Sequence, residues 1–172
     1  MQTGFSLIEV VMVVAIIAIV SAVAVPRLSA ALARQGLDAA VRRIGTDMAY
    51  ARRRAQTTSA GVTVTFDAAA STYALVGIAD MDDPAAAYTV DLSTSPYGVQ
   101  LLTADFGGDA TIVFDGFGVP DTGGLIVIGI GSEVRALSVD AATGMTTLVD
   151  VAPAPGGGFD VLPTAPSPPT VP

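Results

Sequence analysis

One uninterrupted apolar segment near the N-terminus constrains this chain more than any other feature. Residues 5–25 read FSLIEVVMVVAIIAIVSAVAV and contain no Gly, no Pro and a single charged side chain, Glu9. A helix of this length measures roughly 31 Å at ~1.5 Å per residue, which is about the thickness of the hydrocarbon core of a bilayer. The sequence therefore predicts a transmembrane helix over residues 5–25.

Three interpretations of this segment are open. Ala22-Val23-Ala24 resembles the cleavage site of a secretory signal peptide, but residues 1–4 carry no basic side chain and Glu9 lies inside the apolar segment. A simple single-pass anchor is the second interpretation, and Arg27 and Arg34 would then keep the C-terminal side in the cytoplasm. The third interpretation is a helix that leaves the membrane to pack in a filament.

Glu9 favours the third interpretation. An ionised carboxylate inside a transmembrane segment costs several kcal/mol unless it is paired, and residues 5–25 hold no other charge. A cut between Gly4 and Phe5 would place the new α-amine of Phe5 one helical turn from Glu9, on the same face. That amine could neutralise Glu9 of its own chain or of a neighbour. The simpler alternative is that Glu9, near one end of the segment, extends its carboxylate to the membrane surface.

The residues around Glu9 match a known processing signal. Gly4-Phe5-Ser6-Leu7-Ile8-Glu9 closely resembles the signal of type IV pilins and type II secretion pseudopilins. The resemblance implies that a prepilin peptidase removes residues 1–4 and N-methylates Phe5, and that Glu9 guides assembly. Pro26 stands where that family has a helix-kinking proline. The implied partners are other pilin or pseudopilin subunits, the peptidase, the inner-membrane assembly machinery and, before assembly, membrane lipid.

Beyond Pro26 the pattern becomes amphipathic, and we expect the helix to continue through residues 26–56. Apolar residues recur at mostly helical spacing, with Arg and Asp side chains between them: Leu28, Leu32, Leu37, Val41, Ile44 and Met48. Gly36 and Gly45 should each weaken this helix by about 1 kcal/mol relative to Ala. The run Arg52–Arg54 is interpreted as a solvated helix end that suits the negative end of the helix dipole.

From Gly61 onward the apolar period changes to two, which indicates β-strands. The strand candidates are 62–66, 72–78, 88–92, 98–102, 111–114, 125–130, 134–139 and 145–149. The predicted fold class is α+β: a long N-terminal helix packed against a small antiparallel β head over residues 57–151. Residues 152–172 hold seven of the eleven Pro and a Gly156–Gly158 run, which indicates a flexible tail.

The C-terminal half of the head carries a second resemblance. Ile112–Gly118, a strand led by Gly123-Gly124, and Val134–Val139 followed by Thr143-Gly144 resemble the heads of GspH/FimT-type minor pseudopilins. Some members of that family bind DNA through basic residues in this region. Here residues 55–172 contain thirteen acids and one base, Arg135. Because nucleic-acid affinity rests on a basic surface, we do not expect a nucleic-acid partner.

The composition excludes much chemistry. The chain has no Cys and no His, which removes thiol and histidine catalysis and the usual zinc ligands. Asp80, Asp82 and Asp83 are weak candidates for a hard cation such as calcium, but the loop lacks the required ligand spacing and a solvated acidic turn is favoured. Acids in the other predicted turns should bind backbone N–H groups: Asp105, Asp109, Asp115 and Asp121.

Together these features predict a structural subunit, a minor pilin or pseudopilin, of a type IV pilus or type II secretion pseudopilus. It would reside in the bacterial inner membrane first, and then in a periplasmic pseudopilus or a cell-surface pilus. We expect no enzymatic activity and no cofactor. The alternative function is a membrane-anchored or secreted binding module that is not built into a filament.

Overall fold

The computed structural model describes residues 7–80, 83–153 and 159–161. Backbone contacts divide the chain into two units, Met1–Gln35 and Gly36–Pro172. One helix, α1 (Leu7–Thr58), contributes residues to both units. Its bounds agree closely with the helix predicted from the sequence.

In the first unit, α1 exposes its apolar side chains. Every residue from Leu7 to Ala22 is exposed, and the exposed fraction reaches 81% at Leu7. The helix assignment continues without a break through Pro26, so this proline does not end the helix. Within the described residues, no helical stretch combines the length and the apolarity needed to cross a bilayer.

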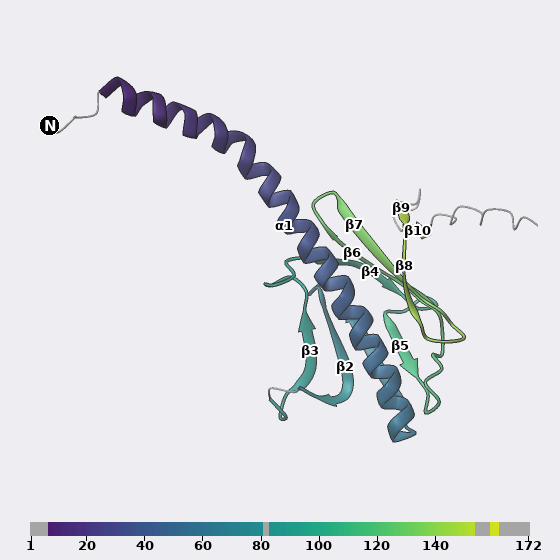
Figure 1. Cartoon of the computed structure of the whole chain (residues 1–172). Helices are drawn as coiled ribbons and strands as arrows, with labels where there is room; N and C mark the ends of the chain where they lie inside the picture. The colour runs from purple at the N-terminus through teal and green to yellow at the C-terminus, as the bar shows by residue number, and fades with distance from the viewer. Residues whose placement is uncertain (1–6, 81–82, 154–158, 162–172) are drawn as a thin grey trace, which may run out of the picture. The chain divides into compact units, whose positions relative to one another are not determined.

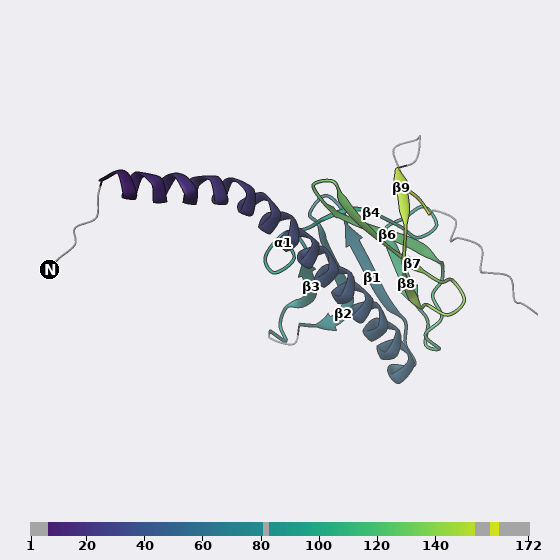
Figure 2. The ribbon, with the colours of Figure 1, turned by 45° about the horizontal axis from the view of Figure 1, so that its top comes forward.

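The second unit joins the rest of α1 to two antiparallel sheets (Figures 1 and 2). The first sheet has the order β3-β2-β1-β5 and the second β4-β6-β7-β8, and a separate pair is formed by β9 and β10. The strands are β1 (Val62–Asp67), β2 (Thr72–Ala79), β3 (Ala87–Asp91), β4 (Gln100–Asp105), β5 (Thr111–Phe114), β6 (Gly124–Ile130), β7 (Glu133–Val139), β8 (Thr146–Val149), β9 (Val151–Pro153) and β10 (Phe159–Val161).

All eight strand candidates correspond to strands of the two larger sheets, and β5 has its predicted bounds. The fourth candidate begins two residues too early, and β4 contains a register shift between Leu101 and Thr103 that a strict period of two does not reveal. Within the region predicted as a flexible tail, residues 152–172, β9 pairs with β10. The high Pro and Gly content of that region hid two three-residue segments able to pair.

The core of the second unit is one face of α1 packed on both sheets. The buried helix residues follow the helical period: Leu37, Ala40, Ile44, Met48, Ala51 and Ala55. Leu28 and Leu32, which continue the predicted apolar stripe, belong to the first unit and are 63% and 57% exposed. The sequence pattern did not find the buried alanines. Small side chains let the helix approach the sheets closely.

The two glycines of this helix are not equivalent, although the sequence assigned them the same cost. A Cβ added at Gly36 would overlap the backbone carbonyl oxygen of Tyr97, whereas a Cβ at Gly45 would have no other atom within 4 Å. We expect Gly36→Ala to lower the free energy of unfolding by about 1–3 kcal/mol through overpacking. Gly45→Ala should raise it by up to about 1 kcal/mol through higher helix propensity. Thermal unfolding followed by circular dichroism measures both, and shifts of the same sign would contradict this assignment.

Candidate functional site

The residues predicted for processing and assembly lie at the start of the chain. Gly4 and Phe5 fall outside the described residues. Glu9 lies in the first turn of α1, where its side chain is exposed and shares a shallow surface hollow with Val10, Val13 and Val14. Pro26 is part of α1, and only its backbone is described. The described part of the first unit therefore presents a carboxylate on an apolar helix surface.

Two of the weak cation candidates, Asp80 and Asp83, lie between β2 and β3. The Asp80 carboxylate accepts the backbone N–H of Asp83 at 3.4 Å, and the Asp83 carboxylate accepts that of Ala85 at 3.0 Å. Asp82 lies outside the described residues. Among the residues that the structure places, no group of three His, Cys, Asp or Glu side chains is arranged to hold a metal ion.

The predicted role of the turn acids is confirmed. Each of the four carboxylates accepts a backbone N–H at 2.8–3.0 Å: Asp105 from Gly108, Asp109 from Thr111, Asp115 from Phe117 and Val119, and Asp121 from Val113 and Thr122. Asp140 does the same between β7 and β8. There, hydrogen bonds from the Thr143 hydroxyl and backbone N–H lower the pKa of Asp140. Much of the negative charge of the head therefore stabilises its turns.

A buried polar cluster connects α1 to β2 and β3. Asp47 is only 5% exposed and accepts hydrogen bonds from the hydroxyls of Tyr73, at 2.5 Å, and Tyr88, at 2.9 Å. Arg43, one turn earlier on α1, donates from Nε to Asp47 at 2.9 Å and from Nη2 to the Tyr88 hydroxyl at 2.5 Å. The carboxylate is thus paired and hydrogen-bonded, as a buried charge must be.

The cluster raises the pKa values of both tyrosines and of Arg43. Burial and the hydrogen bond to Asp47 raise the pKa of Tyr88 to about 12, and the same causes raise the pKa of Tyr73 above its ordinary value. Partial burial opposes the charged form of Arg43, but the adjacent Asp47 carboxylate raises the net pKa of the guanidinium. These shifts favour neutral tyrosines beside a charged Arg43 guanidinium.

Alkaline pH should weaken the head through these tyrosines. In the unfolded chain a tyrosine loses its proton near pH 10, whereas Tyr88 in the folded head retains its proton until about pH 12. The stabilisation is therefore complete below about pH 10 and is lost as the pH rises toward about 12. Urea unfolding measured across this range should show a falling free energy of unfolding. In the double variant Tyr73→Phe with Tyr88→Phe the slope should flatten, and an unchanged slope would contradict the assignment.

The sequence pattern missed this cluster. Arg43 and Asp47 were interpreted as part of the polar side of the amphipathic helix. The available signal was the position of Asp47, directly before Met48 and three residues after Ile44 on the apolar stripe. A second helix aspartate, Asp38, forms an ion pair with Arg135 of β7 at 3.7 Å, with both side chains at least one-third exposed.

The head also matches a known family. The family model described as type II transport protein GspH matches residues 40–144. The chain belongs to this family. The model of the prokaryotic N-terminal methylation motif matches residues 1–25 of this GspH-family chain. The two matches confirm both resemblances seen in the sequence.

A solved structure shares the fold. A crystal structure of the type IV minor pilin FimU from Pseudomonas aeruginosa superposes with a TM-score of 0.51 at 17% identity, over 74% of this chain and 94% of that one. A second crystal form of FimU gives a TM-score of 0.48 at 16% identity, over 72% and 97% of the two chains. No curated protein matches in sequence. The GspH-family chain therefore has the pilin fold, and it is a structural filament subunit of the pilin and pseudopilin class.

Proposed function

We propose that this GspH-family chain is made as a precursor, held in the inner membrane by residues 5–25, cut between Gly4 and Phe5, and N-methylated on Phe5. It is then extracted by the assembly machinery into a type IV pilus or a type II secretion pseudopilus. The observation that carries the proposal is the methylation motif over residues 1–25, with Glu9 as the single charge of the apolar segment.

The first part of α1 supports this assembly role. Its apolar side chains find no cover in their own unit, and exposing so many large apolar residues to water is unfavourable. Lipid before assembly and neighbouring helices after assembly would both cover them. The segment is thus suited to two successive apolar environments.

Glu9 explains why cleavage after Gly4 would be needed for assembly. In apolar surroundings its carboxylate needs a cation, and residues 5–25 provide none from a side chain. Cleavage after Gly4 would create a cation at the α-amine of Phe5. In a filament the amine of one subunit would pair with Glu9 of its neighbour, which would set the axial position of one helix against the next.

The remaining residues fit a structural role without catalysis. In the head, the ionisable side chains with resolved contacts bind turns, as Asp115 and Asp121 do, or join α1 to the sheets, as Asp47 does. We therefore assign the head to contacts with other subunits and expect no enzymatic activity.

The mass of the intact protein isolated from cells tests the proposal. The expected mass corresponds to the loss of residues 1–4 and the gain of one methyl group. A chain that retains Met1, or one cut after Ala24, would overturn the proposal and favour a membrane-anchored or secreted binding module.

A further inference from the structure

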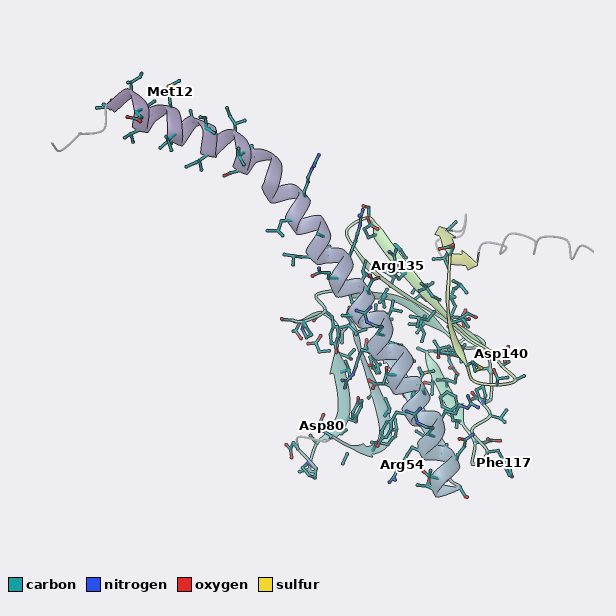
Figure 3. All side chains as sticks on the ribbon, in the orientation of Figure 1. Met12, Arg54, Asp80, Phe117, Arg135 and Asp140 are labelled. Carbon is teal, nitrogen blue, oxygen red and sulfur yellow. The ribbon has the colours of Figure 1, made fainter. Side chains whose placement is uncertain are left out.

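An exposed phenylalanine stands on the loop that joins β5 to β6. Phe117 is 84% exposed, and Val119 of the same loop is 42% exposed. Figure 3 shows Phe117 at the margin of the head, near the end of α1 that carries Arg54. A large aromatic side chain in this position contributes no burial to its own fold, and interfaces are enriched in such residues.

The loop holds Phe117 in a fixed position. The Asp115 carboxylate accepts the backbone N–H groups of Phe117 and Val119 at 2.9 and 2.8 Å. The side chain of Gln56 on α1 donates to the carbonyl oxygen of Phe117 at 2.9 Å. An aromatic group on a fixed loop loses little conformational entropy when it binds. Phe117 therefore presents an exposed apolar side chain on a backbone that is ordered before any partner binds.

The same head has a groove between α1 and the β7–β8 hairpin, with a volume of about 570 Å³. Its hairpin side includes Met145 and Leu148, which are 58% and 60% exposed. Its helix side carries Arg42, Arg52 and Arg53. The groove is thus apolar on one side and basic on the other, and β8 is an edge strand of its sheet.

Arg52 lines the groove and has one buried polar atom. Its Nε atom is buried and has no hydrogen-bond partner within the part of the chain that the structure describes. A buried donor without a partner is unfavourable. Because this atom is buried, it cannot itself meet an incoming group, and Arg52 contributes its positive charge to the groove.

We propose that the Phe117 loop of one copy docks into the α1–β8 groove of a second copy of this chain. The Phe117 ring covers the exposed side chains of Met145 and Leu148. The carboxylates of Asp115 and Asp121, which stand two residues before and four residues after Phe117 in the sequence, face the arginines. A phenylalanine side chain buries about 150–250 Å², and opposite charges around it favour one orientation over others.

This contact joins two different surface patches, so it is heterologous. A heterologous contact repeats from copy to copy and builds an open helical array unless its rotation closes a ring. The inference rests on the proposed filament role, which brings copies of the head together. The inference identifies the two surfaces through which neighbouring heads contact each other.

Disulfide crosslinking between two single-cysteine chains tests the contact. The natural chain has no cysteine, so each introduced thiol is unique. Full-length Val119→Cys, which keeps Phe117, is produced in the same cells as an affinity-tagged Leu148→Cys chain, and a mild oxidant is added. We expect a covalent dimer that contains one chain of each kind. The matched control pairs Leu148→Cys with Ser132→Cys, an exposed site on the β6–β7 turn, and should give little dimer.

Truncating the ring tests the same contact without touching either thiol. Phe117→Ala in the Val119→Cys chain should lower the crosslinked fraction roughly tenfold, since loss of 1.4 kcal/mol weakens association tenfold. Val76→Ala, which truncates an exposed apolar residue of β2 (55% exposed), should leave the fraction unchanged. Equal crosslinking of the 119–148 and 132–148 pairs, or no effect of Phe117→Ala, would overturn the inference. Normal processing and filaments without the 119–148 dimer would do so too, while leaving the proposed function intact.

Discussion

Filaments should be lost when Glu9 is replaced by glutamine, although the protein should still insert into the membrane. Glutamine removes the charge and keeps the length of the side chain, so the apolar segment becomes easier to bury. The partner amine of Phe5 in the neighbouring subunit would then have no counter-charge in an apolar surrounding. We expect membrane fractions to contain normal amounts of the variant, whereas sheared surface or periplasmic filaments contain none of it.

Two further variants separate charge from packing at this position. Glu9→Asp keeps the charge on a shorter side chain and should retain part of the assembly. Val10→Ala truncates an adjacent apolar residue, 52% exposed in the isolated chain, and should assemble nearly normally. Filaments of normal abundance from Glu9→Gln would refute the role assigned to Glu9.

A large loss of stability is expected when Asp47 is replaced by alanine. The change leaves Arg43 and the hydroxyls of Tyr73 and Tyr88 without their shared acceptor. Breaking a buried pair by removing one partner typically costs 3–5 kcal/mol. Because Arg43 retains a side-chain exposure of 41%, we expect about 3 kcal/mol at neutral pH, measured by urea unfolding followed by circular dichroism.

Asp38→Ala is the matched control for this prediction. Asp38 is also an aspartate on α1 with an arginine partner, but its ion pair with Arg135 is 3.7 Å long and its side chain is 50% exposed. Exposed pairs of this kind contribute between zero and about 1 kcal/mol. Similar losses for the two variants would show that burial of Asp47 is not what makes it important.

The elements of the fold were largely predictable because their signals are local. Alternation of apolar residues located β1, β2 and β5, and Asp, Gly and Pro marked the turns between strands. The helix bounds followed from a helical apolar period and from the Arg52–Arg54 run near its end. Errors arose where the backbone departs from the simple period, as at the register shift of β4.

The candidate sites also differ in whether local sequence signals predict them. The motif Gly4-Phe5 with Glu9 is a linear signal, and its roles in cleavage and pairing remain predictions for experiment. The Asp47 cluster, the groove and the exposure of Phe117 depend on which residues meet in space. Tyr73 and Tyr88 lie 26 and 41 residues from Asp47. No pattern within a short segment of the chain could bring these side chains together.

The sequence by itself determined three features: the apolar helix with its single carboxylate, the positions of the strands along the chain, and the turns in which aspartates bind backbone N–H groups. Each of these depends on a residue and its near neighbours, through hydrogen bonding and periodic burial. Only the tertiary structure decided that Asp47 is buried while Asp38 is exposed, and that Gly36 is required while Gly45 is open. The physical reason is that the burial of a helix residue depends on which residues pack against it. Those residues come from strands and loops that are distant in the sequence.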